Sequence, residues 1–493
     1  MQYQFLRIVF FAFMSLFIWQ LTACKKDSLI KTPGSALVFE LDTLSFDTVF
    51  TDMGSATRKF KVYNPHNQRI IVSNIRIAGG TASDFNINID GQNTHTADDV
   101  EILAGDSIYI YANVRIDPNN GDIIRTDSII FETNGSEQKV ILEAFGWNAV
   151  YIGYKDSLTR YTNTNMTLDP NTPYVFFGYV VFDTNSVLTI PAGTEIFMYG
   201  GPSSRPGQRA TLFIGLNSSL KINVGGDLSN PVEFKTHRLE EDYQELPFQH
   251  GGIYLLPGSV DNEIHGCIIR NAVDGIIVDS LSNNHPTPKL DIRNSMIYNV
   301  DRSCILARTG SIYAENCILA NSNQFNFIAI LGGIYDFRHS TLVNFGVNPF
   351  VGRNEAIVSL RDFIVDADDN IIPSPVSPFY AHFTNCVIYG TKEEEVEVAR
   401  ATQVTWDYSF DYCFMKLDTF NQNLNNCIIN QEPYFKDLDN YEYIPDTTAS
   451  QLINAGLTPI GASPYLTPLP SSINRDAEGK SRDANPDIGA YEF

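Results

Sequence analysis

The clearest pattern in the chain is a short phrase of alternating apolar and polar positions that recurs between residues 266 and 430. Each copy starts with a small residue, has Ile or Leu two places later, and usually has Asn four places later. The copies start at Cys267, Ser295, Cys317, Ser340, Cys386 and Cys427, so they are separated by steps of 28, 22, 23, 46 and 41 residues. Period two is the periodicity of a β-strand, and Asn favours turns. Each phrase therefore predicts one short strand followed by one turn.

A repeat near 22 residues, sometimes lengthened by an insertion, predicts a parallel β-helix. A helical repeat would need apolar positions three and four residues apart and a longer unit. In a β-helix the coils stack at about 4.8 Å, and each strand buries one face against its neighbours. We therefore expect a right-handed parallel β-helix over residues 173–433, preceded by a linker or first cap strand over 148–172.

The repeated positions predict two ladders. The initial Cys and Ser residues should point inward as small core residues, so we expect the cysteines to be mainly buried thiols without a zinc site. The six cysteines beyond Cys24 are Cys267, Cys304, Cys317, Cys386, Cys413 and Cys427. The Asn residues should stack in the turn and hydrogen-bond to one another. These are Asn271, Asn299, Asn321 and Asn344.

Residues 35–147 show a different β pattern. Short strand-like runs alternate with turn signals such as Asn64-Pro65, Gly79-Gly80 and Asn134-Gly135. The runs are residues 37–41, 58–63, 70–77, 85–89, 107–116, 128–132 and 138–144. Their number and spacing predict an antiparallel β-sandwich, so the whole chain is predicted to be all-β.

Composition narrows the possible partners. The 493 residues include 57 Asp and Glu but only 34 Lys and Arg, which gives a net charge of −23. Such an acidic chain is a poor match for a phosphate backbone, so we expect no nucleic-acid partner.

Residues 1–24 predict a processing segment. Arg7 precedes an apolar run over 8–19, which is short for a membrane span. The closing Leu21-Thr22-Ala23-Cys24 resembles the bacterial lipobox. That resemblance implies that Cys24 is lipidated and anchors the chain in a membrane. Because Lys25 rather than Asp follows, the resemblance favours the outer membrane and leaves the membrane face open.

Three further resemblances concern architecture. Phe60-Lys61-Val62-Tyr63-Asn64 and Leu103-Ala104-Gly105-Asp106 resemble the abnormal-spindle-type immunoglobulin-like domains, which implies a spacer or binding module at 35–147. The phrases from Val187-Leu188-Thr189-Ile190-Pro191 to Gly251-Gly252-Ile253 resemble the opening coils of bacterial right-handed parallel β-helix proteins. The tail, 434–493, resembles their closing segment and should cap the solenoid, with Asp476, Arg482 and Asp487 in a capping salt bridge.

Candidate chemistry lies in inserted loops. Residues 237–250 and 391–399 are acidic. We expect the first to be a solvated loop, with a metal site on His237, His250 and neighbouring carboxylates as the alternative. The segment with Asp366, Asp368, Asp369 and Asn370 spaces its oxygens suitably for calcium but lacks the Gly and late Glu of an EF-hand loop. No cofactor is expected, with calcium the one alternative.

Two classes of function stay open. Pectate-lyase-like lyases and polygalacturonase-like hydrolases share the expected fold, but the Gly-His-Gly and Arg-Ile-Lys motifs of the hydrolases are missing. Arg270, Lys289 and Arg293 are available as lyase bases, although no motif marks them. The sequence favours a non-catalytic, lipid-anchored envelope module that presents a β-helix face to a glycan or protein. A polysaccharide lyase or glycoside hydrolase is the alternative.

Overall fold

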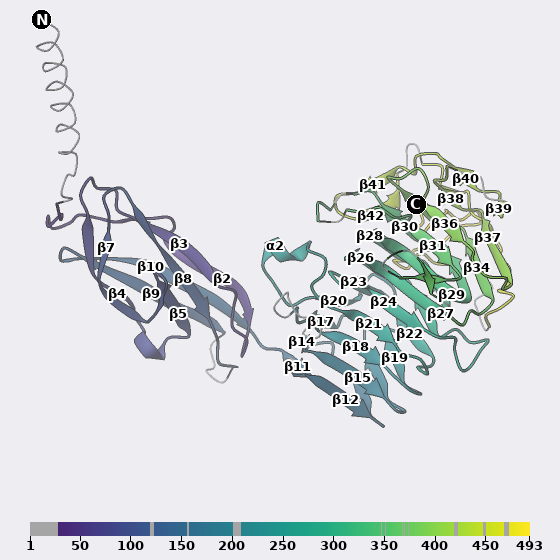
Figure 1. Cartoon of the computed structure of the whole chain (residues 1–493), viewed down its shortest axis with the longest axis horizontal. Helices are drawn as coiled ribbons and strands as arrows, with labels where there is room; N and C mark the ends of the chain where they lie inside the picture. Colours follow the sequence, from purple (N-terminus) through teal and green to yellow (C-terminus); the bar gives the residue numbers. More distant parts are fainter. Residues whose placement is uncertain are drawn as a thin grey trace, which may run out of the picture. The chain divides into compact units, whose positions relative to one another are not determined.

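The structure is a computed structural model that describes residues 28–118, 123–154, 157–200, 209–346, 348–350, 352–366, 368, 370–372, 374–418, 423–446, 450–467 and 473–493. The chain divides into two compact units, Met1–Asn148 and Ala149–Phe493. Figure 1 labels the strands of both units. The processing segment and Cys24 lie outside the described residues.

The first unit is a sandwich of two five-stranded sheets. In spatial order, one sheet contains β1 (Val38–Phe39), β3 (Arg58–Tyr63), β8 (Ser107–Val114), β5 (Phe85–Ile89) and β6 (Gln92–Asn93). The other contains β2 (Thr43–Phe50), β10 (Ser136–Trp147), β9 (Ile124–Thr133), β4 (Ile70–Ile77) and β7 (Thr96–Ile102). A one-turn 3-10 helix, η1 (Gly80–Ala82), follows β4.

Alternation of apolar and polar residues builds this sandwich. In β8 every second residue is buried, so Ile108, Ile110 and Ala112 enter the core while Tyr109 and Tyr111 stay half-exposed. Neighbouring strands pair antiparallel, except that β2 runs parallel to β10. The sequence missed β2, β6 and β7, but the predicted antiparallel sandwich is confirmed.

The second unit is a parallel β-helix in which each complete coil contributes three strands. We call the three columns row A, row B and row C. Rows A and B share a 17-stranded sheet, and row C is an 11-stranded sheet. Figure 1 shows strands of the coils stacked from β11 to β40.

Row A contains β12 (Leu158–Thr162), β15 (Tyr179–Asp183), β18 (Thr211–Ile214), β21 (Gly252–Leu255), β24 (Ile276–Asp279), the first halves of β27 (Ser303–Glu315) and β29 (Phe325–Arg338), β31 (Val358–Arg361) and β36 (Val396–Ala399). Row B contains β13 (Asn165–Thr167), β16 (Val187–Ile190), β19 (Ser219–Ile222), β22 (Asn262–His265), β25 (Leu290–Arg293), the second halves of β27 and β29, β34 (Phe379–Thr384), β37 (Trp406–Asp411) and β39 (Leu424–Asn425). Row C contains β11 (Val150–Ile152), β14 (Tyr174–Phe176), β17 (Glu195–Met198), β20 (Val232–Thr236), β23 (Cys267–Arg270), β26 (Met296–Val300), β28 (Ile318–Ser322), β30 (Thr341–Asn344), β35 (Val387–Gly390), β38 (Phe414–Met415) and β40 (Ile428–Ile429).

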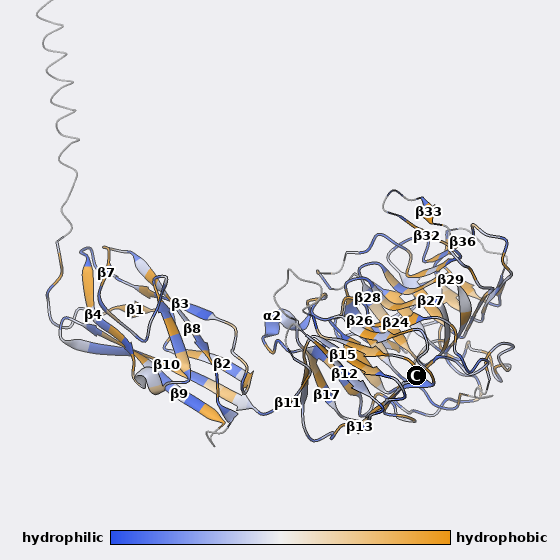
Figure 2. Cartoon of the chain, turned by 60° about the horizontal axis from the view of Figure 1, so that its bottom comes forward, coloured by the Kyte–Doolittle hydropathy of each residue, from blue (hydrophilic) through white to orange (hydrophobic). Residues whose placement is uncertain are grey.

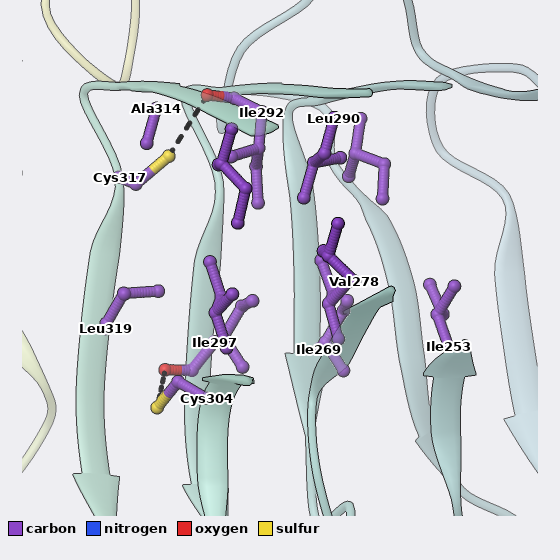
Figure 3. Packing of buried hydrophobic residues seen from close by; sticks show 14 of the residues in the cluster. Ile253, Ile269, Val278, Leu290, Ile292, Ile297, Cys304, Ala314, Cys317 and Leu319 are labelled. Atoms are coloured by element: carbon purple, nitrogen blue, oxygen red, sulfur yellow. Dashed lines mark hydrogen bonds between the residues drawn. The ribbon is translucent and has the colours of Figure 1, made fainter. Parts of the chain in front are cut away.

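The solenoid core consists of one inward-facing side of every row. Ile253 from row A, Ile292 from row B and Leu319 from row C belong to one continuous buried cluster. Figure 3 shows these side chains stacked between the strands, with the thiols of Cys304 and Cys317 among them. Apolar residues concentrate in the strands of the coils, as the orange segments of Figure 2 show. Burial of this stack is the main favourable contribution to the stability of the coils.

The remaining elements decorate the coils. The helix α2 (Glu241–Gln244) lies in the loop after β20, and β32 (Ile364–Val365) pairs with β33 (Ile371–Ile372) in a hairpin between rows A and B. The tail adds a second hairpin, β41 (Phe435–Asp437) and β42 (Glu442–Pro445). None of the helices in the described part of the chain has the length and apolarity to cross a membrane.

The tail covers the outer side of row C. Tyr443, Leu452 and Ile488 of the tail form a buried cluster with outward-facing residues of row C such as Ile318 and Val387. The predicted C-terminal cap therefore lies along the side of the solenoid. The reason is that outward positions of row C are themselves apolar and need cover.

Candidate functional site

The repeated Cys and Ser residues are structural. Cys267, Ser295, Cys317, Ser340 and Cys386 are all buried, while Cys427 is half-buried. The amide of Cys267 donates to Oγ of Ser295 at 3.2 Å. The amide of Cys317 makes the equivalent bond to Ser340. Burial raises the pKa of Cys317 to about 12, so its thiol is a poor nucleophile at neutral pH.

The side chains of the Asn residues that follow these phrases do not bond to one another, contrary to the sequence-based expectation. Asn271 Nδ2 donates to the carbonyls of Gln244 and Leu246, at 2.7 and 3.0 Å. Asn299 Nδ2 donates to Glu245 Oε2, Asn321 Nδ2 to the Tyr443 hydroxyl, and Asn344 Nδ2 to the Ser322 carbonyl. The side-chain amides of Asn271, Asn299 and Asn321 are bonded to the inserted loop or the tail instead of to a neighbouring Asn. Three of the four therefore hold added segments onto the coils.

A side-chain ladder exists on the opposite turn, between rows B and C. Asn316 Nδ2 donates to Asn294 Oδ1 at 3.0 Å, and Asn385 Nδ2 lies 2.9 Å from His339 Nε2. All four residues have positive φ, between 45° and 55°. Asn tolerates this left-handed region better than most residues, which explains its use there. The sequence carries a signal for this ladder, because each of these four residues directly precedes the Cys or Ser that starts a repeated phrase.

The predicted capping residues come together, but with a different ion pair. Arg482 Nη1 contacts Glu492 Oε2 at 3.0 Å, and both side chains are buried. Asp476 Oδ1 instead accepts from the amides of Glu478 and Lys480, and Asp487 Oδ1 accepts from the amide of Asn454. The expected salt bridge is thus replaced by Arg482–Glu492 because the two Asp residues bind backbone amides. Glu492 was missed by the sequence analysis.

The calcium candidate has a structural role in the described residues. Asp366 Oδ1 accepts hydrogen bonds from the amides of Asp368 and Asn370, both at 2.9 Å, and so closes the β32–β33 hairpin. Asp369 lies outside the described residues. Nowhere in the described ranges do three His, Cys, Asp or Glu side chains form a group able to hold a metal ion.

The acidic loops are anchored by individual carboxylates. Glu395 forms a buried ion pair with Arg353, at 2.7 Å. Glu245 Oε2 accepts from Tyr441 at 2.5 Å and from Asn299, so it joins the 237–250 loop to the tail hairpin. His250 is buried and binds the amide of Gly252 and the carbonyl of Arg270 through its two ring nitrogens. These contacts are structural.

The outer face of row B carries a run of ion pairs beneath the tail. Arg293 forms two hydrogen bonds with Asp291, at 2.7 and 2.6 Å, and Arg338 forms an equivalent pair with Asp336. Leu466 of the tail packs on Tyr313 between them. Although burial opposes ionisation, hydrogen bonds from His265 and Arg293 hold the pKa of Asp291 below its ordinary value. Paired carboxylates under a covering segment are poorly placed to attack a sugar.

The outer face of row A presents a partly exposed polar cluster, Tyr254–Asp279–Arg308. Arg308 Nε and Nη2 donate to the two oxygens of Asp279 at 2.6 and 2.8 Å, and the Tyr254 hydroxyl donates to Asp279 Oδ2 at 2.6 Å. The Arg308 side chain is 40% exposed. Three successive coils thus place a hydroxyl, a carboxylate and a guanidinium side by side. We treat this cluster as the candidate site.

The electrostatics of the cluster follow from partial burial. Burial raises the pKa of Asp279 to about 6, while the Lys289 ammonium acts in the opposite direction, as does the bidentate contact with Arg308. Lys289, one of the three basic candidates, is itself buried, and burial lowers its pKa to about 8. Its Nζ donates to the Leu256 carbonyl at 2.8 Å and to Ser280 Oγ at 3.1 Å. Lys289 therefore supports the turn behind the site.

The other two basic candidates do not reach this cluster in the fold. Arg270 belongs to row C, where Nη2 donates to Gln244 Oε1 at 3.3 Å. Arg293 belongs to row B and is paired with Asp291. Arg308, which the sequence analysis did not single out, has no motif around it. Only the register of the coils reveals that it lies next to Asp279.

The apolar side chains on the outer face of row A pack against one another. The rings of Phe213 and Tyr254 stack with centroids 5.4 Å apart, so only their edges and the Tyr254 hydroxyl face outward. Ile277 and Ile328, on the same outward column, are buried. Leu306 lies between them on this column and Ile330 pairs with Arg308, and both are half-buried, so the face around the cluster is mixed in polarity.

Comparisons with known proteins give little guidance. No family model matches the chain. No curated protein matches it either. A family 123 glycoside hydrolase from Clostridium perfringens aligns at 11% identity and a TM-score of 0.19. The match spans 27% of this chain and only 27% of that hydrolase. The catalytic domain of a GH87 alpha-1,3-glucanase in complex with tetrasaccharides aligns over 76% of this chain and 88% of that domain, at 11% identity and a TM-score of 0.18. With TM-scores this low, the functional argument rests on the side chains.

Proposed function

We propose that this protein is an exported, lipid-anchored envelope protein. Its β-helix binds a glycan along the outer face of row A and does not catalyse cleavage of that glycan. The observation that carries the proposal is the partly exposed Tyr254–Asp279–Arg308 cluster. A guanidinium and a carboxylate joined by two hydrogen bonds can still donate to and accept from neighbouring sugar hydroxyls. The lipobox-like segment ending at Cys24 supports the anchor, and the −23 net charge argues against nucleic acid.

The shape of the solenoid suits a linear glycan. Consecutive coils repeat at about 4.8 Å, close to the length of one sugar in an extended chain. A glycan lying along row A would therefore meet one coil per sugar. A protein partner is less well supported, because protein interfaces use exposed aromatic and aliphatic anchors. The outward Ile277 and Ile328 beside the cluster are buried, and Leu306 and Ile330 are half-buried, so none of these four side chains is fully exposed.

The pairing of the charges supports binding over catalysis. Glycoside hydrolysis requires two carboxylates about 5–10 Å apart across the scissile bond. On row A, Asp279 is followed by Arg308, Ile330 and Arg361 on the next coils, so no second carboxylate adjoins it among these residues. On row B the carboxylates Asp291 and Asp336 are held by arginines.

A polysaccharide lyase remains the alternative, and one contact favours it. The Arg308 guanidinium hydrogen-bonds to the Tyr254 hydroxyl. A cation beside a phenol can lower the pKa of that phenol and make it a proton donor or acceptor. In this structure, however, the hydroxyl donates its hydrogen to Asp279 and is not directed at an open position for a substrate proton.

Retention and turnover should be measured on the same samples. The soluble chain from Lys26 onward, which keeps every described residue, is passed over immobilised neutral and acidic glycans with and without calcium. We expect retention on a glycan to fall about tenfold or more in Arg308→Ala, since a hydrogen bond to a charged group contributes about 1.5–3 kcal/mol. Arg58→Ala, which breaks an exposed Arg–Asp pair in the sandwich, is the matched control.

Two results would overturn the proposal. Equal retention of Arg308→Ala and the parent would remove row A as the binding face. Release of unsaturated products, followed by ultraviolet absorbance, or of new reducing ends would establish an enzyme instead.

A further inference from the structure

Three cysteines occupy the same inward position on the last three coils of row C. Cys386 directly precedes β35, Cys413 precedes β38, and Cys427 precedes β40. Val387 pairs with Phe414, and Phe414 pairs with Ile428. The three cysteines therefore follow one another at the spacing of the coils. Earlier in the row, Ser295 and Ser340 separate the cysteines.

The spacing of adjacent coils suits a disulfide. Neighbouring strands in a parallel sheet lie about 4.8 Å apart, and disulfide-linked Cα atoms lie about 4.4–6.8 Å apart. The thiols of Cys413 and Cys427 each donate to a carbonyl of the preceding coil, Phe383 at 3.3 Å and Phe410 at 3.1 Å. Both sulfur atoms thus lie on the same side of their strands, in line with each other.

Access distinguishes the two adjacent pairs. Cys386 and Cys413 are fully buried, whereas Cys427 on the last coil is half-buried. An oxidant must first reach one thiol, and Cys427 is the one of the three within reach. The final coil is also held by the shortest strands, since β38, β39 and β40 contain two residues each.

We propose that Cys413 and Cys427 form a reversible disulfide that fastens the last coil of the β-helix. The oxidant is a small disulfide such as oxidised glutathione. The Cys427 thiolate attacks it and forms a mixed disulfide, releasing one glutathione thiol. Cys413 then attacks the sulfur of Cys427 and releases the second. The two cysteines lose two electrons, and their protons end on the two released thiols.

The geometry makes this bond easy to reduce. Side chains at paired positions of a parallel sheet run side by side, so their Cβ atoms also start about 4.8 Å apart, beyond the usual 3.5–4.5 Å of a disulfide. The coils must approach each other to close the bond, and strained disulfides have higher reduction potentials. The site therefore responds to the redox state of its surroundings rather than forming a permanent crosslink.

Formation should be slow and pH-dependent. Burial raises the pKa of Cys413 well above its ordinary value, and contact with Cys413 together with burial does the same for Cys427. Thiolates are the reacting species, so the reaction should speed up at higher pH or when the last coil opens.

The test uses the soluble chain from Lys26 onward, incubated with oxidised glutathione at pH 8.5, then denatured with an alkylating reagent. We expect the number of free thiols to fall from six to four, with a linked peptide pair containing Cys413 and Cys427. Reduced glutathione in excess should restore all six. Cys427→Ser should retain all five of its thiols under the same treatment. Cys317→Ser, which removes a thiol flanked by Ser295 and Ser340, is the matched control and should still form the link.

Three outcomes would overturn the proposal. The first is that all six cysteines can still be alkylated after oxidation of the folded chain. The second is a pair of linked peptides that contains Cys386 and Cys413. The third is a link that persists in excess reduced glutathione, which would make the bond permanent rather than reversible. Because Cys427 is half-buried, its replacement by Ser should leave the fold intact, and an unchanged circular dichroism spectrum checks this.

Discussion

Arg482 Nη2 donates a hydrogen bond to Asn316 Oδ1 at 3.0 Å, which ties the tail to the turn between rows B and C. The same guanidinium binds Glu492, and Asn316 also binds Asn294 and the carbonyl of Arg475. A residue of the ladder and a residue of the tail therefore share one buried polar network.

Replacing Arg482 by Ala should strongly destabilise the chain. It leaves Glu492 buried without its cation, and breaking a buried ion pair costs about 3–5 kcal/mol. Chemical denaturation of Arg482→Ala would measure the loss. Arg475→Ala, which removes an exposed side chain of the same segment, should change stability by less than about 0.5 kcal/mol. Equal effects of the two replacements would contradict the network.

His250 predicts acid sensitivity. Burial lowers the pKa of this imidazole to about 4, whereas the unfolded chain titrates near 6.5. The unfolded state therefore binds more protons between these values, so stability is full above pH 6.5 and is lost as the pH falls. Between pH 8 and pH 5.0 the loss should be about 2 kcal/mol. Denaturation curves of His250→Gln, which has no titrating ring, should show a shallower pH dependence than the parent.

Gly252 and Gly225 form a matched pair for backbone strain. Both have positive φ, 76° and 83°, but a Cβ on Gly252 would lie 1.9 Å from the Asp274 carbonyl, whereas one on Gly225 meets nothing within 4 Å. Gly225→Ala should cost about 1–2 kcal/mol from the left-handed conformation alone. Gly252→Ala adds a clash with fixed backbone and should lower the thermal midpoint considerably more. Similar midpoints would show that the turn can relax.

Glu245 should control the stability of the inserted loop. Its carboxylate accepts from Asn299 and Tyr441, and bonds to a charged group contribute about 1.5–3 kcal/mol. Trypsin should therefore cut Glu245→Ala after Arg238 about tenfold faster than it cuts the parent. Glu241→Ala, which changes an exposed residue of α2, should be cut at the parental rate. Equal cutting of the two variants would show that the loop is held elsewhere.

The sequence predicted the architecture because strand periodicity is local. The period-two phrases at Cys267 and Cys317 need only a few residues to indicate an inward face, and both cysteines are buried there. The all-β class with a sandwich followed by a parallel β-helix is confirmed. Strand β2 was missed because its alternation, Leu44 and Phe46 buried, is interrupted by Asp47 with φ of 51°.

The site could not be predicted in the same way. Arg308 and Asp279 are 29 residues apart and meet only because β24 and β27 pair in one register. Insertions of variable length precede each coil, so sequence spacing does not give that register. The prediction of the hydrogen-bond partners of Asn271 and Asn299 was wrong for a related reason. Their partners Gln244 and Glu245 come from an inserted loop, and no repeat in the sequence determines the path of that loop.

The lateral tail has a consequence for the order of assembly. The amide of Leu228, near the start of the solenoid, binds the carbonyl of Ala477, sixteen residues before the end of the chain. During synthesis from the N-terminus, each coil can stack on the one before it. The outer face of row C, however, stays uncovered until residues 434–493 have been made. Synthesis of residues 434–493 is thus also the step that hides the apolar outer face of row C. A prematurely stopped chain would carry that face uncovered and be marked for aggregation or degradation.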